Sequence, residues 1–148
     1  MAINSAVSQG TLNRLRGSIV VTDNSDLNVT SEYLSAGGIS IAPEGNVTDF
    51  INTLTGRVTS PVPYLPVTIT IHLNRAQSLA ATWWNQAQTN SLIGNVTVTP
   101  DVTTFPNITV LNCGITSVPA QTYTGQDPDY PIVVQGYVIV NNTLWQTT

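Results

Sequence analysis

The residues that could carry catalysis or bind a metal are few in this chain. It has one histidine, His72, one cysteine, Cys113, eight acidic residues, four arginines and no lysine. A zinc site needs several His, Cys, Asp or Glu ligands at workable spacing, and His72 and Cys113 fall on different expected strands. A Ser-His-Asp triad needs only one histidine, but the G-x-S-x-G nucleophile elbow is absent. The residues therefore favour a protein that is not an enzyme and that uses no cofactor and no metal.

His72 and Cys113 each have a plain structural interpretation. His72 alternates onto the polar face of an expected strand, beside Thr70 and Asn74, which predicts a surface or interface histidine. Cys113 ends an apolar run that begins at Ile108, and it has no partner within the chain for a disulfide. We therefore predict a buried and unreactive thiol.

Two other groups of residues have both a structural and a binding interpretation. The stretch Asp127–Asp129 contains a proline and is typical of a turn, with a calcium site as the alternative. Trp83 and Trp84 fit the core and boundary of an amphipathic helix. The alternative is a platform on which a sugar ring stacks, built from these tryptophans with Tyr123 and Tyr130.

Charge is scarce along the whole sequence. Charged residues make up 8% of the chain, against roughly 25% in ordinary globular proteins. The net charge is −4 and the arginines are scattered, so no basic patch for nucleic acid is expected. Protein interfaces are depleted in charge at their cores, so a subunit surrounded by partners fits this composition. A secreted, Thr/Asn-rich β-sandwich is the alternative.

The length and the start of the sequence predict one soluble domain, residues 1–148, with a polar N-terminal arm over 1–16. The first residues lack the basic and apolar regions of a signal peptide. Apolar runs stay well below the ~20 residues that cross a bilayer. We therefore expect synthesis in the cytosol and no membrane insertion.

The first half of the chain contains short strand patterns separated by turn residues. Strands are expected at 18–22, at 27–33, which alternates apolar and polar residues, and at 39–41, where Pro43 limits the strand. The glycine-containing stretch 36–38 is expected to be a turn between the last two.

The segment 44–66 has many glycines and prolines, yet it also carries apolar residues. An exposed loop gains nothing from such residues, so we predict an extended hairpin or arm that buries them against something else. The candidate subunit-interface residues are Val47, Phe50, Ile51, Leu54, Arg57 and Val58.

The clearest strand and the only strong helix follow one another. Residues 67–74 alternate strictly between β-branched or leucine residues and polar residues, which predicts a half-buried strand. The helix is predicted over 75–89, with Asn74 as N-cap and Gln77 completing a capping box. Leu79, Trp83 and Ala87 share the face that should pack on the sheet.

Three more strands are expected at 95–99, 107–111 and 132–140, with a long polar connection over 117–131. The last strand is apolar at nearly every position, which predicts cover on both faces. About six or seven strands with one flanking helix predict a mainly β fold, a β-sandwich or small barrel.

The order of these features resembles the tail tube proteins of contractile-tailed bacteriophages, which are related to the tube subunits of type VI secretion. The resemblance covers residues 38–101 well and the flanks loosely. It rests on an ordered set of stretches: Pro43–Phe50, Thr55–Ser60, Pro66–Leu73, Ala76–Ala80, Gln88–Gly94 and Val96–Asp101.

This resemblance implies a structural virion protein of the phage tail, assembled in the cytoplasm of the host bacterium. Hexameric rings would stack into a hollow tube that delivers DNA, with an acidic surface that does not retain phosphates. The implied partners are copies of itself, the tail sheath protein, and baseplate and tail terminator proteins. Two other functions stay open: another virion structural protein (baseplate, terminator or decoration subunit) and a carbohydrate-binding β-sandwich.

Overall fold

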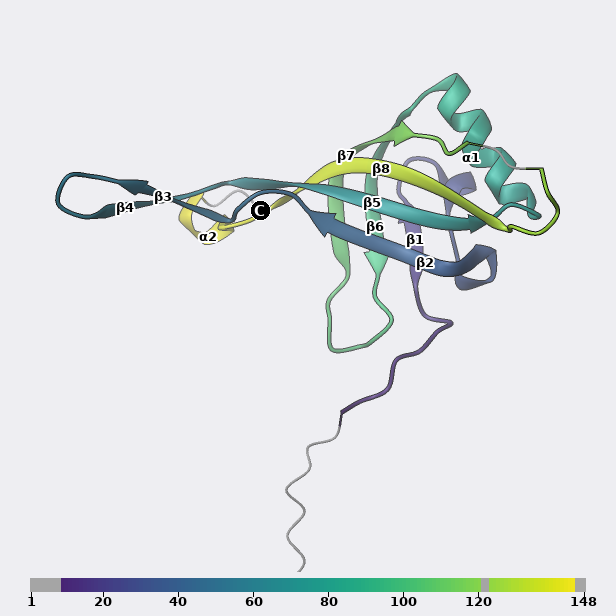
Figure 1. Cartoon of the computed structure of the whole chain (residues 1–148), viewed down its shortest axis with the longest axis horizontal. Helices are drawn as coiled ribbons and strands as arrows, with labels where there is room; N and C mark the ends of the chain where they lie inside the picture. Colours follow the sequence, from purple (N-terminus) through teal and green to yellow (C-terminus); the bar gives the residue numbers. More distant parts are fainter. Residues whose placement is uncertain (1–8, 121–122, 146–148) are drawn as a thin grey trace, which may run out of the picture.

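The computed structural model describes residues 9–120 and 123–145, and within them the chain is mainly β. The strands are β1 (Ser18–Val21), β2 (Leu34–Pro43), β3 (Thr48–Asn52), β4 (Arg57–Pro61), β5 (Tyr64–Asn74), β6 (Leu92–Thr99), β7 (Ile108–Ser117) and β8 (Asp129–Ile139). The helices are α1 (Ser78–Thr89) and the short α2 (Asn142–Trp145). The predicted mainly β class with one flanking helix is confirmed (Figure 1).

Six strands form one antiparallel sheet in the order β1-β6-β7-β8-β5-β2, and β3 pairs with β4 in a separate two-stranded sheet. The large sheet curves as a half-barrel, so that β1 and β6 cross over the long strands β5 and β8 (Figure 1). The hydrophobic core fills the concave side of this one sheet. In a β-sandwich, by contrast, the core would lie between two separate sheets.

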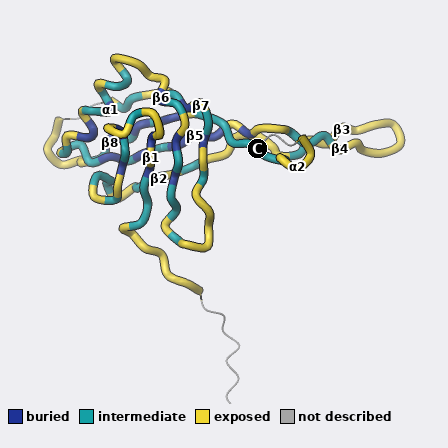
Figure 2. Tube along the Cα trace, turned by 180° about the vertical axis from the view of Figure 1, so that it is seen from behind, coloured by how far each residue is buried: buried dark blue, intermediate teal, exposed yellow. Residues whose placement is uncertain are grey.

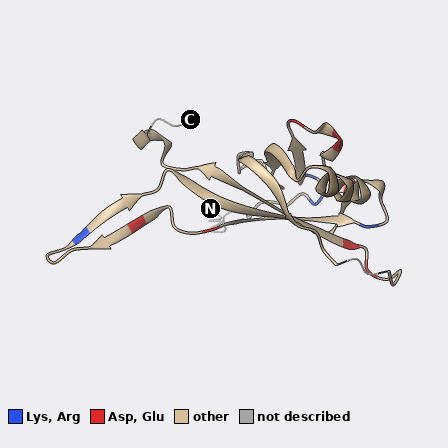
Figure 3. Cartoon of the chain, turned by 90° about the horizontal axis from the view of Figure 1, so that it is seen from above, with Lys and Arg blue, Asp and Glu red and all other residues tan. Residues whose placement is uncertain are grey.

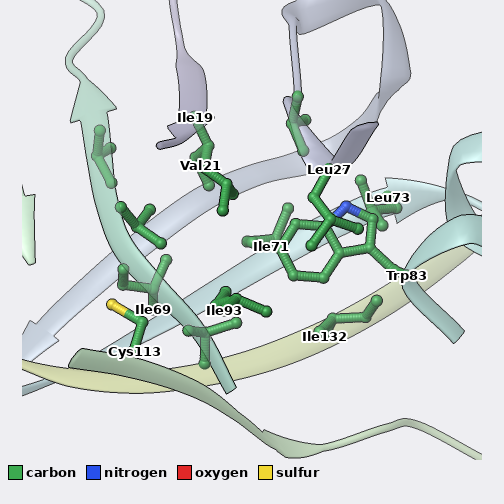
Figure 4. Close-up of a cluster of buried hydrophobic side chains, with 14 of the residues drawn as sticks. Ile19, Val21, Leu27, Ile69, Ile71, Leu73, Trp83, Ile93, Cys113 and Ile132 are labelled. Carbon is green, nitrogen blue, oxygen red and sulfur yellow. The ribbon is translucent and has the colours of Figure 1, made fainter. Parts of the chain in front are cut away.

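The core is built by the alternating strands and by one face of α1. In β5, Val67, Ile69, Ile71 and Leu73 are all buried, as the alternation predicts. Trp83 of α1 reaches into the same cluster and is fully buried (Figure 4). Burying apolar side chains in this way is the main favourable term in folding.

Other core predictions hold less well. Leu79 lies in the core cluster with Trp83, whereas Ala87 is half-buried and outside it. The prediction that β8 is covered on both faces is wrong, because its residues alternate between buried and half-buried up to Val134. Burial is concentrated in the large sheet, and exposure is highest in β3 and β4 (Figure 2).

The prediction of a strand at 27–33 is also wrong, although its alternating apolar residues are buried. Leu27 and Val29 are buried. The segment nevertheless forms two 3-10 turns, Ser25–Leu27 and Ser31–Tyr33. Between these turns, Val29 makes a single β-bridge to Ile19 of β1. The side chain of Asn28 accepts the backbone N–H of Val21 at 2.9 Å. Since that side chain takes the donor a second strand would use, pairing with β1 stops after one bridge.

Residues 36–38 lie inside β2 and form no turn between strands. The register of β2 on β5 shifts between Leu34 and Ile39, so the pairing is irregular over this stretch. Gly38 has a φ of +65°, and a Cβ at Gly37 would lie 2.7 Å from the His72 ring. Gly38 thus allows the positive φ in the irregular part of β2, and Gly37 leaves space for the imidazole of His72.

The helix begins three residues later than predicted and ends where expected. Gln77 is the N-cap residue of α1, and its side chain makes no capping bond. Asn74 uses its side chain to accept the N–H of Ala76 and its carbonyl to accept the N–H of Gln77. The predicted capping box is therefore wrong, because Asn74 closes a turn before the helix.

The strands after α1 are present but longer than predicted, since β6 begins at Leu92 and β7 extends to Ser117. Residues 1–8 of the expected N-terminal arm lie outside the described residues, and residues 9–16 contain no helix or strand. In the described part of the chain, no helix is long and apolar enough to cross a membrane.

Candidate assembly surface

His72, Asp129 and Ser35 meet where β5, β8 and β2 lie side by side. The carboxylate oxygen Oδ1 of Asp129 is 3.1 Å from Nδ1 of His72 and accepts a 2.9 Å hydrogen bond from the Ser35 hydroxyl. In a catalytic triad the imidazole stands between serine and carboxylate, so that it can take the serine proton. Here the serine and the imidazole both contact the carboxylate, which joins three strands and activates no nucleophile.

The Asp127–Asp129 stretch is the turn that the sequence indicates. Oδ1 of Asp127 accepts the backbone N–H of Asp129 at 3.0 Å, and the carbonyl of Asp127 accepts a hydrogen bond from Arg75. Among the described residues, no three His, Cys, Asp or Glu side chains gather closely enough to hold a metal ion. The calcium alternative thus has no ligand cluster in this part of the chain.

Cys113 lies in the core, 1% exposed, and its thiol donates to the carbonyl of Val110 at 3.3 Å. Burial raises the pKa of Cys113 to about 11, against a smaller lowering by a backbone hydrogen bond from Val96. A thiol with this pKa is almost entirely protonated at neutral pH, and the thiolate is the nucleophile.

We expect Cys113 to resist a disulfide reagent at pH 8 and to react completely once the protein is unfolded in denaturant. Because the folded pKa lies above the ordinary value of 9.0, folding gains stability below pH 9 and loses it as the pH rises from 9 to about 11. The loss should reach roughly 3 kcal/mol, measured by urea unfolding at stepped pH. Rapid labelling of the folded protein at pH 8 would contradict this prediction.

The four aromatic residues considered as a sugar platform do not all lie together. Trp83 and Tyr130 are both buried in the core, at 0% and 4% exposed. Trp84, Tyr123 and the edge of Tyr130 line a groove of about 680 Å³. We call it the helix groove, and its walls are α1 and the connection that follows residue 122. Its full lining is Arg75, Ala76, Ala80, Ala81, Trp84, Tyr123, Gly125, Gln126, Asp127, Pro128 and Tyr130.

The segment 44–66 forms the hairpin that the sequence predicts, with β3 and β4 joined by a turn at 53–56. We call β3, β4 and this turn the projecting hairpin, because it extends away from the half-barrel at one end of the long axis (Figure 1). Every residue from Asp49 to Thr59 is exposed (Figure 2). The hairpin thus has almost no contact with the core.

Apolar side chains lie on both faces of the projecting hairpin. Ile51 pairs with Val58 on one face, and these residues are 55% and 53% exposed. On the opposite face the guanidinium of Arg57 lies 4.7 Å from the centre of the Phe50 ring, a cation–π contact. Leu54 at the tip is fully exposed.

Charge on the hairpin is limited to one residue of each sign, Asp49 and Arg57 (Figure 3). Val47, at the base, is 44% exposed. All six predicted interface residues therefore lie on or beside one projecting element, and water covers much of each apolar side chain. A two-stranded sheet of this kind is marginally stable alone.

The base of the hairpin is held firmly by the body of the protein. Asn141, which has a φ of +54°, donates through its side-chain amide to the carbonyls of Val62, at 2.8 Å, and Val47, at 3.2 Å. The N–H of Val140 also donates to the carbonyl of Pro63. These bonds tie both hairpin strands to the end of β8 and fix the direction in which the hairpin extends.

Sequence reasoning missed Asn141 and the helix groove. Asn141 directly follows the expected strand at 132–140, and asparagine is one of the few residues that tolerate positive φ. The Asn-Asn pair at 141–142 was therefore the available signal. The groove had no local signal, because its two walls come from segments far apart in the sequence.

Comparisons with known proteins find similarity in solved structures alone. No protein family matches the sequence, and no curated protein matches it. The chain is similar to the cryo-EM structure of the cap that terminates the tube of the anti-feeding prophage, with 18% identity and a TM-score of 0.48. The similarity covers 95% of this chain and 99% of the cap chain. A similarity this low does not define a family or a function.

Proposed function

We propose that this chain is a structural subunit of a contractile tail-like particle, and that it associates with copies of itself through the projecting hairpin. The observation that supports the proposal is the hairpin itself, which exposes Phe50, Ile51, Leu54 and Val58 on two faces of a thin element. Apolar surface removed from water stabilises an association by roughly 25 cal/mol per Å². Within residues 9–120 and 123–145 the hairpin extends away from the core, so in this proposal a second copy supplies that burial.

The scarcity of charge supports a partner that covers much of the surface. Only 8% of residues are charged, and interface cores are depleted in charged residues. The four arginines form no basic stripe, so a lumen lined by such subunits would not bind the phosphates of passing DNA. Stacked hexameric rings enclosed by a sheath protein and bounded by baseplate and terminator proteins are the finer form of this proposal.

Two roles within such a particle differ in how assembly ends. A tube subunit forms rings that stack without limit, whereas a terminator forms a ring that stops further stacking. Both roles use a ring-forming subunit of the particle tail, so both are consistent with the projecting hairpin.

We expect purified protein to sediment as oligomers whose size grows with concentration, and to show rings or tubes by negative-stain electron microscopy. Tubes of variable length would assign the tube role, and single rings that do not stack would assign the terminator role. A monomer at every concentration would contradict both.

A second candidate function is carbohydrate binding in the helix groove. It is favoured by Trp84 and Tyr123 lining one cavity, although the burial of Trp83 and Tyr130 removes two of the four expected rings. The test is a glycan array with the wild type and Trp84→Ala. Glycan binding that is lost in Trp84→Ala would support this second candidate, and a wild type that binds no glycan would contradict it.

A further inference from the structure

The geometry points to the helix groove as the site that receives the projecting hairpin of the next copy. This inference rests on the proposed function and adds the acceptor surface to it. The occupant is the tip of the hairpin, residues 53–56, with Leu54 entering first. The contact joins two different surfaces of identical chains, a head-to-tail association.

The placement of the two features in the molecule supports a head-to-tail contact. The hairpin extends from one end of the long axis, and α1 lies at the opposite end (Figure 1). A contact between a hairpin at one end and a groove at the other joins two different surfaces, so a head-to-tail association leaves one hairpin and one groove free for further copies. Repetition of such a contact generates a ring when the rotation closes, and an open filament when it does not.

The shape and composition of the groove suit a thin apolar element. Ala76, Ala80 and Ala81 present small side chains on the helix side, and Trp84 and Pro128 add larger apolar surface. The tip enters between the two walls of the groove, and the apolar residues on the two faces of the hairpin lose water at its rim. The volume of about 680 Å³ lies within the ~300–1,000 Å³ of clefts that take ligands. It therefore accommodates the tip, with the rest of the hairpin at the rim.

The charges of the two surfaces are complementary. The groove has Arg75 and Asp127, and the hairpin has Arg57 near its tip and Asp49 nearer its base. In the described part of the chain the only ion pair is His72 with Asp129, so the Asp127 carboxylate retains acceptor capacity for an arginine. Arg57 can thus meet Asp127 without displacing an existing ion pair.

The test uses two variants that each destroy one side of the contact. Leu54→Asp puts a carboxylate on the fully exposed hairpin tip, and Ala81→Glu puts one on the exposed helix side of the groove. Each variant alone should weaken self-association by at least about 30-fold, the effect of one interface hot spot. Gln88→Glu is the matched control, because it adds the same charge to an exposed position of α1 outside the groove.

Mixing the two variants in equal amounts gives the decisive result. One variant keeps an intact hairpin and the other an intact groove, so sedimentation should show a heterodimer that does not grow further. The protein with both changes should remain monomeric when studied alone. Circular dichroism melts check that all variants are folded, which their exposed positions predict.

The outcomes separate this inference from the proposed function. If Leu54→Asp fails to assemble while Ala81→Glu assembles like the wild type, the hairpin is a connector and its acceptor lies elsewhere. Two folded, monomeric variants that form no heterodimer on mixing would also overturn the inference. If the wild type and both variants assemble equally, the hairpin is not the connector and both proposals fail.

Discussion

Replacing Phe50, Ile51 and Val58 together by threonine is expected to abolish assembly and to leave the subunit folded. Each side chain is about half exposed in the single chain, so folding depends little on it. Threonine keeps the β-propensity of the hairpin, which confines the change to apolar area. Burying the exposed half of each side chain is worth about 1 kcal/mol, so the triple variant should lose more than a hundredfold in association constant.

The measurement is sedimentation velocity over a concentration series, with electron microscopy of the same samples. The matched control replaces three exposed apolar residues of the body, Val20, Leu92 and Phe105, by threonine. This control should assemble like the wild type, because it removes a similar exposed area from other places. Normal rings or tubes from the hairpin variant would remove the basis of the proposed function.

The sequence predicted the hairpin because two of its features conflicted. Glycines and prolines indicated a loop, and apolar residues such as Phe50 and Ile51 indicated burial. A two-stranded hairpin accounts for the turn residues, which form its ends, whereas its apolar side chains are exposed in the single chain. The strand over β5 was predictable for a simpler reason, because strict alternation matches the period of a half-buried strand.

The predictions for residues 27–33 and 36–38 were wrong because side chains or distant strands determine the backbone conformation there. Leu27 and Val29 face the core as predicted, but the side chain of Asn28 replaces a backbone partner and prevents a strand. Gly37 and Gly38 were interpreted as a turn because the ring of His72, from another strand, cannot be foreseen from their neighbours.

One part of the candidate site was predictable from the sequence and the other part was not. The projecting hairpin is a local element and was predictable from residues 44–66 alone. The helix groove depends on how α1 and the connection before β8 meet, as Trp84 and Pro128 show. Its walls are separated by more than thirty residues of sequence, so no pattern of spacing could have placed them together.

Gly136→Ala is expected to destabilise the fold more than any surface change. A Cβ at this position of β8 would lie 2.6 Å from Cγ1 of Val110, and 2.8 Å from both the thiol sulfur of Cys113 and the carbonyl oxygen of Leu111. The close approach follows from β7, whose register on β8 shifts between Leu111 and Gly114. Side chains can change rotamer, but the carbonyl belongs to the sheet backbone, so a strand must move.

Overpacking of this kind costs about 3 kcal/mol, the upper part of its usual range. For a chain of 148 residues that corresponds to a fall in Tm of roughly 6–12 °C, measured by calorimetry or circular dichroism. Gly17→Ala is the matched control, because a Cβ there meets only Cδ1 of Ile39, at an ordinary 3.9 Å. Combining Gly136→Ala with Val110→Ala should recover little stability, since the carbonyl of Leu111 remains in place. A Gly136→Ala protein that melts like the wild type would mean that β7 yields at its bulge without cost.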